Sequence, residues 1–310
     1  MALGRAVVFS EVLVKRIVRW IGFLVVALIA IVAVGALITV VASNRALDER
    51  VVVAPPLPVL GHGTVDRGKH LYTAVANCIE CHGGDGGGGP FITDSAMAVL
   101  NAPNLTRGAG GVGTLYSDAD YDRAIRRGIR SGGTRLIIMP SWGYAALSDS
   151  DAASIVAYVR TLAPVERANP RVRLGPVGRM LMVTHKLRMD AGRIADEGAP
   201  PSPPPPMMVR EYGKYLTRIG GCMSCHGTHL SGGHLEGPPD VPPASNLTRT
   251  GIGTWYASDF MRTLTTGRDP AGHVLHPFMP WRTIRNMDDR ELEAIFDYLQ
   301  SVPPRDTGNG

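Results

Sequence analysis

The chain has 310 residues, and its 32 Lys and Arg exceed its 27 Asp and Glu by five. Residues 1–19 carry a net charge of +3, which leaves only +2 for all the remaining residues. A surplus this small excludes a basic groove of the kind that binds nucleic acid, so we expect no nucleic-acid partner.

An uncharged and almost wholly apolar segment runs from Trp20 to Ala42. Its 23 residues suffice to cross a bilayer, at about 1.5 Å per residue. A cleaved signal peptide is the alternative, with Val41-Ala-Ser43 as its cleavage site. The apolar run is longer than the core of about 7–15 residues that such peptides use, so we expect a retained transmembrane anchor over residues 20–42.

Charges on the two sides of this segment predict its orientation. The residues before it are mostly basic, and those directly after it sum to zero: Arg5, Lys15, Arg16 and Arg19 precede it, whereas Arg45, Asp48, Glu49 and Arg50 follow. The positive-inside rule therefore places residues 1–19 in the cytoplasm and the rest of the chain outside. Residues 43–64, which include Pro55-Pro-Leu-Pro58, are expected to form a linker.

Two copies of the pattern C-x-x-C-H use all four cysteines. They read Cys78-Ile-Glu-Cys81-His82 and Cys222-Met-Ser-Cys225-His226. This spacing is typical of a c-type haem attachment site, because each thiol forms a thioether with one vinyl group of the porphyrin. The adjoining histidine then binds the iron from the proximal side. We therefore expect two covalently attached haem c groups.

Three other uses of the cysteines are less consistent with the pattern. A disulfide suits an exported protein but does not explain a histidine after each pair. A structural zinc site uses two C-x-x-C pairs about 15–20 residues apart, far closer than these two. A thioredoxin-type redox pair expects a strand and a helix around it, whereas glycine-rich loops follow both motifs.

The repeat extends beyond the cysteines. Asn104-Leu-Thr-Arg107 recurs as Asn246-Leu-Thr-Arg249, and Met139-Pro140 recurs as Met279-Pro280. Two tandem domains of about a hundred residues each follow from this duplication. We place them at residues 65–164 and 207–304, joined by a connector over 165–206 that ends in a proline-rich linker, with a short tail over 305–310.

Within each copy the regular segments are helical in pattern. Helices are predicted to lead into both haem motifs, to begin at Ser117 and end at Gly128, and to begin at Ser148 with apolar residues at helical spacing. Counterparts are expected near Ser258 to Gly267 and around Leu292 to Leu299. No segment shows sustained strand alternation, so the predicted fold class is all-α, with the haem as part of each core.

The sixth ligand of each iron is predicted from the repeat. Met139 and Met279 share their Met-Pro context, whereas Met97 in the first domain has no counterpart. We expect His82 and Met139 to bind one iron, and His226 and Met279 the other. In the second domain a histidine remains an alternative, and the available ones are His229, His234, His273 and His276.

Other recurrent residues have two readings. Asn104, Asn246, Arg107 and Arg249 could pair with haem propionates, or they could shape a loop and face water. Trp142 and Trp281 are expected to pack near the haem. The basic and apolar stretch from Arg171 to Met189 could lie on the bilayer surface or pack between the domains, and we favour packing.

Taken together, these motifs resemble the class I cytochrome c family. The resemblance is strongest to multihaem cytochrome c subunits that accept electrons from bacterial membrane-bound dehydrogenases, although this chain has two haem domains, not three, and an N-terminal anchor. The resemblance implies an electron carrier and not an enzyme, with a dehydrogenase as donor and a cytochrome or oxidase as acceptor. The apolar segment and its flanking charges, together with haem attachment on the exported side, predict a single-pass protein of the bacterial inner membrane with both haem domains on the periplasmic side.

A dihaem peroxidase is the alternative function, and it would need one haem with an open distal position. A haem-based gas sensor is a third hypothesis. Low-spin iron with methionine ligation favours electron transfer, whereas high-spin iron favours the other two.

Overall fold

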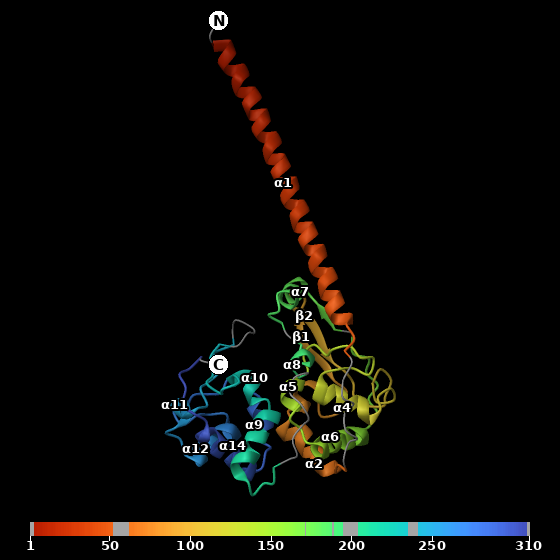
Figure 1. The fold of residues 1–310 in the computed structure, drawn as a ribbon, viewed down its shortest axis with the longest axis vertical. Coiled ribbons are helices and arrows are strands. Elements are labelled where there is room, and N and C mark those ends of the chain that lie inside the picture. The colour runs from red at the N-terminus through yellow and green to blue at the C-terminus, as the bar shows by residue number, and fades with distance from the viewer. Residues whose placement is uncertain are drawn as a thin grey trace.

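A computed structural model of the chain describes residues 3–51, 62–170, 172–187, 189–194, 204–234 and 241–308. The predicted proline-rich stretches at 55–58 and 200–203 lie outside the described residues. One long helix, α1 (Leu3–Asp48), stands away from a globular part that holds the two haem motifs (Figure 1). Its segment Val14–Asp48 is long and apolar enough to cross a membrane, and the predicted span over 20–42 lies inside it.

The first haem domain is built from short helices joined by loops. Its helices are α2 (Val65–His70), the π-helix η1 (Leu71–Val75), α3 (Cys78–His82), α4 (Asp118–Arg127), α5 (Ser141–Tyr144) and α6 (Asp149–Thr161). Ser117 caps α4 by accepting a hydrogen bond from the amide of Asp120, and Gly128 ends the helix in the left-handed region at φ 66°. Ser148 caps α6 in the same way. These starts and stops confirm the ones predicted from the sequence.

The second haem domain repeats this order. It contains α9 (Val209–Ile219), α10 (Cys222–His226), α11 (Arg249–Ile252), α12 (Ala257–Thr266), α13 (Trp281–Ile284) and α14 (Asp289–Ser301). The helix expected from Ser258 begins one residue earlier and ends, as predicted, before Gly267 at φ 72°. The buried residues of both domains form one continuous hydrophobic cluster, so the domains share a core.

A small antiparallel sheet departs from the all-α prediction. Strands β1 (Gly89–Asp94), β2 (Ala98–Ala102) and β3 (Arg173–Leu174) pair in the order β1-β2-β3. Thr93 pairs with Val99, which in turn pairs with Arg173. The strands were missed because each is short and the third comes from a segment far along the chain, so no local alternation reveals them.

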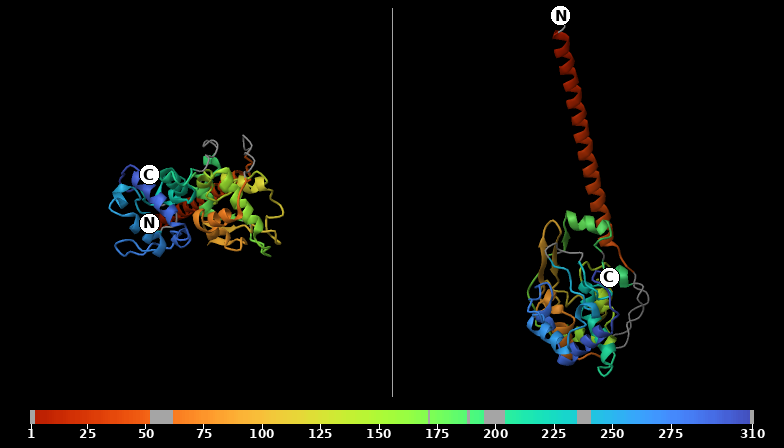
Figure 2. Two further views of the ribbon diagram at one scale, coloured as in Figure 1. Left: turned by 90° about the horizontal axis from the view of Figure 1, so that it is seen from below. Right: turned by 90° about the vertical axis from the view of Figure 1, so that its left-hand side faces the viewer.

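The connector after the first domain forms α7 (Pro176–Val183) and α8 (Ala191–Ile194). We predicted that this stretch packs between the two domains. Instead, α7 packs against the C-terminal end of α1 and against the sheet, in a second, smaller hydrophobic cluster with Ala46, Leu47, Leu100 and Met182. Two views show α7 at the edge of the globular part from which α1 leaves (Figures 1 and 2).

In each domain the first and last helices cross at a glycine. Helix α2 meets α6 at Gly68, where a Cβ atom would overlap the carbonyl oxygen of Ser154. Helix α9 meets α14 at Gly213, where a Cβ atom would overlap the carbonyl oxygen of Ala294. The two crossings are equivalent in the repeat, and each holds the helix that leads into a haem motif.

Replacing Gly213 with alanine should therefore destabilise the haem-loaded protein. Overpacking of this kind costs about 1–3 kcal/mol of unfolding free energy, because α9 and α14 must move apart. Guanidinium denaturation followed by circular dichroism would measure the change. Gly132→Ala is the matched control, since nothing lies within 4 Å of the added Cβ there. Equal midpoints for the two variants would contradict the close crossing.

Candidate haem sites

The first haem motif occupies a single helical turn. Asn77 precedes it in the left-handed region, at φ 52°, and Cys78 and Cys81 follow three positions apart on one face of α3. Both thiols are free of any disulfide. Burial raises the pKa of Cys78 to about 12 and also raises that of Cys81, so both are neutral thiols before a haem is attached. The pair is therefore placed for attachment to one flat group.

His82 follows directly and is held by one ring nitrogen. Its Nδ1 lies 3.1 Å from the carbonyl oxygen of Pro103. Burial lowers the pKa of this imidazole, which favours the neutral ring. A neutral ring that donates from Nδ1 leaves the lone pair of Nε2 for a metal.

The second motif has the same geometry. Gly221 precedes it at φ 74°, burial raises the pKa of Cys222 to about 12, and the Nδ1 of His226 lies 2.7 Å from the carbonyl oxygen of Ser245. Burial again lowers the pKa of the imidazole. Pro103 and Ser245 each come directly before the repeated Asn-Leu-Thr stretch, so this loop orients the histidine in both domains.

The repeated asparagines shape that loop. Asn104 Oδ1 accepts hydrogen bonds from the amide and hydroxyl of Thr106, at 2.9 and 2.8 Å, while its Nδ2 donates to Val165. Asn246 does the same with Thr248 and Arg305. Both the oxygen and the nitrogen of each amide are hydrogen-bonded within the protein. The structure therefore supports the hypothesis that Asn104 and Asn246 shape a loop, over the hypothesis that they pair with haem propionates. Arg107 and Arg249 are exposed.

Met139 and Met279 lie at equivalent places, directly before the short helices α5 and α13. Both are partly buried and pack against the shared core. Met97 lies in the turn of the β1–β2 hairpin, where its carbonyl oxygen accepts a hydrogen bond from Gly175. The four alternative histidines of the second domain, His229, His234, His273 and His276, are all exposed. The two methionines remain the predicted ligands.

Further features near these segments fit a haem. Ile138 and Phe278, which precede the two methionines, are 44% and 49% exposed, although both are large and apolar. The Nε1 of Trp281 is buried and has no hydrogen-bond partner among the described residues. A flat apolar group with carboxylate side arms would cover Ile138 and Phe278, and one of its carboxylates would accept a hydrogen bond from Trp281.

Comparison with known proteins agrees with this geometry. Residues 63–159 match the family described as cytochrome c oxidase, cbb3-type, subunit III, and residues 211–303 match the family described as cytochrome c. The sites therefore define a c-type cytochrome. The chain belongs to the cytochrome c family and carries two covalently bound haem c groups, one in each domain.

Relatives with stated roles are similar over most of the chain. The fructose dehydrogenase cytochrome subunit of Gluconobacter japonicus is 28% identical over 280 residues, which covers 81% of this chain and 55% of that protein. The alcohol dehydrogenase (quinone) cytochrome c subunit of Komagataeibacter europaeus is 27% identical, covering 76% and 56%. A dihaem c-type cytochrome of Cereibacter sphaeroides is 27% identical, covering 78% and 86%. The chain thus spans about half the length of the two dehydrogenase subunits.

The segments around the two haem motifs meet across the domain interface. Asn77, which precedes the first motif, donates from Nδ2 to the carbonyl oxygen of Gly220, which lies just before the second, at 3.1 Å. Glu80, inside the first motif, accepts a hydrogen bond from the hydroxyl of Thr283 in α13. In the reciprocal contact, the guanidinium of Arg218 lies 5.2 Å from the ring centre of Trp142 in α5. The first motif therefore touches the segment that follows Met279, and the helix that leads into the second motif touches the segment that follows Met139.

A buried cluster of charges joins the same two domains. Glu291 of α14 accepts from Arg67 at 3.2 Å and from His70 at 2.7 Å, both on α2 of the first domain. Asp151 of α6 accepts from Tyr215 on α9 of the second domain at 2.8 Å. Asp151 also forms two hydrogen bonds with Arg67, both 3.1 Å long. The two acids thus take donors from both domains. Sequence analysis missed this cluster, because its members come from four separate segments.

Protonation of His70 should make the interface sensitive to pH. The hydrogen bond to Glu291 raises the pKa of His70 above its ordinary 6.5. Burial alone would raise the pKa of Glu291, but His70 and Arg67 hold it below its ordinary 4.5. A raised histidine pKa stabilises the folded state below pH 6.5, and this contribution is lost as the pH rises through the raised value. The lowered carboxylate pKa adds stability above pH 4.5, which is lost as the pH falls.

We therefore expect the unfolding free energy to decline on the alkaline side of pH 6.5, and His70→Gln to flatten that decline. Arg67 and Asp288, which also act on His70, are unchanged in this variant. Denaturation midpoints measured on both sides of pH 6.5 would test this. His62→Gln, which changes an exposed histidine that is not a candidate ligand, should keep the native slope. A slope unaffected by His70→Gln would show that other groups control the pH dependence.

Proposed function

We propose that this cytochrome is an electron carrier anchored in the membrane, and that its two haem domains pass electrons one at a time. The observation that carries this proposal is the hydrogen bond between Asn77 and Gly220, which lie one and two residues before the two haem motifs and so bring the motifs close together. Bound haem supplies reversible one-electron chemistry, and electron transfer is favoured when its redox centres lie close together. The donor is a dehydrogenase, in keeping with the relatives named as dehydrogenase cytochrome subunits, and the acceptor is a cytochrome or an oxidase.

His82 with Met139, and His226 with Met279, would hold the two haem irons. The carbonyl oxygens of Pro103 and Ser245 fix the imidazole rings, which limits rearrangement when the charge on the metal changes. The partly buried thioethers supply a soft ligand that favours the reduced metal. Two side chains on each iron would leave no position for a substrate. The relatives named as dehydrogenase cytochrome subunits and as a dihaem cytochrome likewise do not favour the peroxidase alternative.

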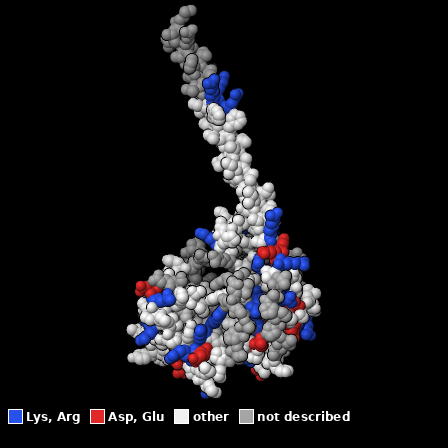
Figure 3. Space-filling view, in the orientation of Figure 1, with Lys and Arg blue, Asp and Glu red and all other residues white. Residues whose placement is uncertain are grey.

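Helix α1 holds the domains at the periplasmic face of the bacterial inner membrane. Basic residues gather near its N-terminal end, and an uncharged stretch separates them from the mixed charges beside the globular part (Figure 3). This distribution supports a cytoplasmic N-terminus by the positive-inside rule. Haem c attachment on the exported side of bacterial membranes is consistent with that orientation.

The isolated, oxidised protein should contain only low-spin iron, and its reduced form should bind no carbon monoxide. Visible spectra before and after exposure to carbon monoxide would test both points. Substantial carbon monoxide binding, or peroxide turnover by the unaltered chain, would contradict the proposal and would favour the dihaem peroxidase.

Alanine in place of Met279 should open one axial position. That haem should then bind carbon monoxide. Its reduction potential should decrease, because the identity of the axial ligand sets haem potentials over a span of about 0.8 V. The first domain should keep its spectrum, and Met139→Ala should give the converse result. Spectroelectrochemical titration would resolve the two haems.

Met261→Ala is the matched control for Met279→Ala, and Met97→Ala is the control for Met139→Ala. Each control removes a methionine from the same domain as its test variant and leaves the predicted ligands unchanged. Both should leave ligation intact. If Met279→Ala behaves like Met261→Ala, the sixth ligand is another residue, and His276 would be examined first.

The anchor makes a separate prediction. The chain should stay with the membrane after alkaline washing, and its N-terminal sequence should begin before residue 20. Release into the wash, or an N-terminus just after Ser43, would indicate cleavage at the alternative site.

A further inference from the structure

Helix α7 is tied to the end of α1 that meets the globular part. Arg179 of α7 donates from Nη1 to the hydroxyl of Ser43 at 2.6 Å and to Oδ1 of Asn44 at 2.7 Å. Ser43 is fully buried by these contacts. The guanidinium therefore fixes α7 beside the first residues that follow the apolar span.

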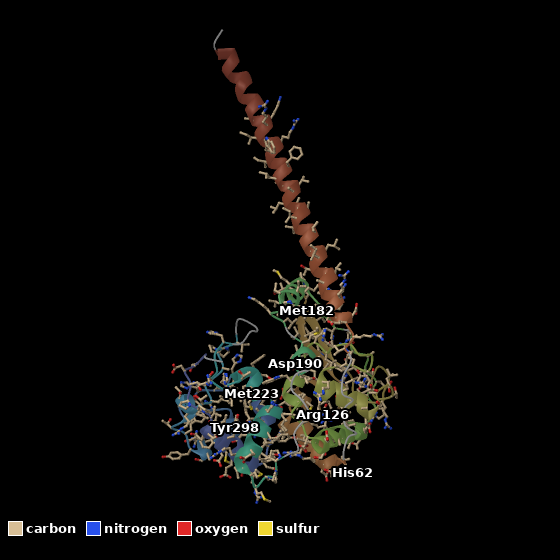
Figure 4. The ribbon with its side chains drawn as sticks, viewed as in Figure 1. His62, Arg126, Met182, Asp190, Met223 and Tyr298 are labelled. Atoms are coloured by element: carbon tan, nitrogen blue, oxygen red, sulfur yellow. The ribbon has the colours of Figure 1, made fainter. Side chains whose placement is uncertain are left out.

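The underside of α7 is held by a rigid platform. Met182 is buried against Leu174 of β3 and against Ala46 and Leu47 of α1, and it lies close to the end of α1 in Figure 4. The amides of Gly175 and Val177 donate to the carbonyl oxygens of Met97 and Ala96 in the β1–β2 turn, each at 3.0 Å. The sheet thus carries α7 and joins it to the first haem domain.

The outer side of α7 is apolar and uncovered. Val177 is 49% exposed and Met180 is 57% exposed. They are three positions apart and so share one face of the helix, with Pro176 also exposed at its start. Two exposed basic residues flank the helix in the chain, Arg173 before it and Lys186 after it. This combination of an apolar face and flanking cations is typical of a helix that lies at a membrane surface.

The position of α7 follows from that of α1. Each helical residue advances about 1.5 Å, so Ser43 and Asn44 lie within a few ångströms of the end of the apolar run at Ala42. Headgroups begin where the apolar run ends. Helix α7 runs across α1 and not along it, as a helix in the plane of the membrane would (Figure 2).

We propose that α7 lies in the outer headgroup layer of the bilayer, with Val177 and Met180 in contact with the acyl chains and with Arg173 and Lys186 near anionic phosphates. The proposal rests on α1 being a retained anchor. Lipid is the occupant that the structure favours, because α1 must itself be surrounded by lipid and α7 packs against the end of its apolar span. The contact would fix the height and orientation of the first haem domain above the membrane.

Spin labels on the full, haem-loaded chain would test this in nanodiscs of phosphatidylcholine and phosphatidylglycerol. The four native cysteines are held as thioethers, so one introduced cysteine at a time can be labelled. Met180→Cys is the test position. Met207→Cys is the control, because Met207 is 85% exposed and lies at the start of the second domain. Val32→Cys reports on the anchor.

Collision with oxygen, which concentrates in lipid, is compared with collision with a water-soluble nickel complex. The label at residue 180 should show an oxygen preference several times that at residue 207. Val177→Glu in the same labelled chain should reduce this preference, whereas Val274→Glu, at an exposed site in the second domain, should not. Replacing phosphatidylglycerol with phosphatidylcholine should weaken the preference, because Arg173 and Lys186 then lose their anionic partners; an unchanged preference would overturn the role of these two cations.

An equal preference at residues 180 and 207 would overturn the proposal while a lipid-exposed label at residue 32 left the anchor standing. A label at residue 180 shielded from both reagents would also overturn it and would indicate a protein partner on this face. A water-exposed label at residue 32 would overturn the anchor and this proposal together.

Discussion

Two buried carboxylates hold the globular part of this protein together. Asp151 and Glu291 sit at the starts of equivalent helices, and each receives hydrogen bonds from both haem domains. A buried carboxylate without partners is strongly unfavourable, so the domains cannot separate without exposing or stranding these charges. Because the haem motifs lie in the same interface, the cluster also keeps the two redox sites together. The relative placement of the two haem motifs thus depends on a contact made by side chains outside both motifs.

Much of the haem chemistry could be predicted from the sequence, since its signals are local. The spacing of Cys78, Cys81 and His82 occupies one helical turn, and the structure forms that turn. Capping by Ser117 and Ser148 was equally local and was confirmed. The roles of Met139 and Met279 rest on the repeat, and they stay predictions. Asn104 and Asn246 were left between two readings, and their amide hydrogen bonds favour the structural one.

What could not be predicted depends on pairs of residues far apart in the chain. Strand β3 has two residues and gains its identity only from β2, more than seventy positions earlier. Nothing in the sequence around Arg179 indicates that its side chain binds Ser43, which is 136 positions earlier in the chain. The cluster of Arg67, His70 and Glu291 joins α2 to α14, which are more than 220 positions apart in the sequence. In each case no periodicity, motif or cap carries the information, because the partner is set by tertiary packing.

The interface also bears the mark of its duplication. Gly68 and Gly213 are equivalent, so Arg67 corresponds to Tyr212 and His70 to Tyr215, and Asp151 corresponds to Glu291. The geometry is that of a twofold homodimer, in which one patch pairs with its own copy. Yet one half now supplies cations where the other supplies phenols. Two copies of the second domain would bring only carboxylates and hydroxyls to such an interface. The carboxylates are therefore better neutralised when the second domain pairs with the first, which supplies Arg67 and His70. The two haem domains therefore bring different charges to an interface whose geometry is nearly symmetric, and each half is fitted to the other and not to a copy of itself.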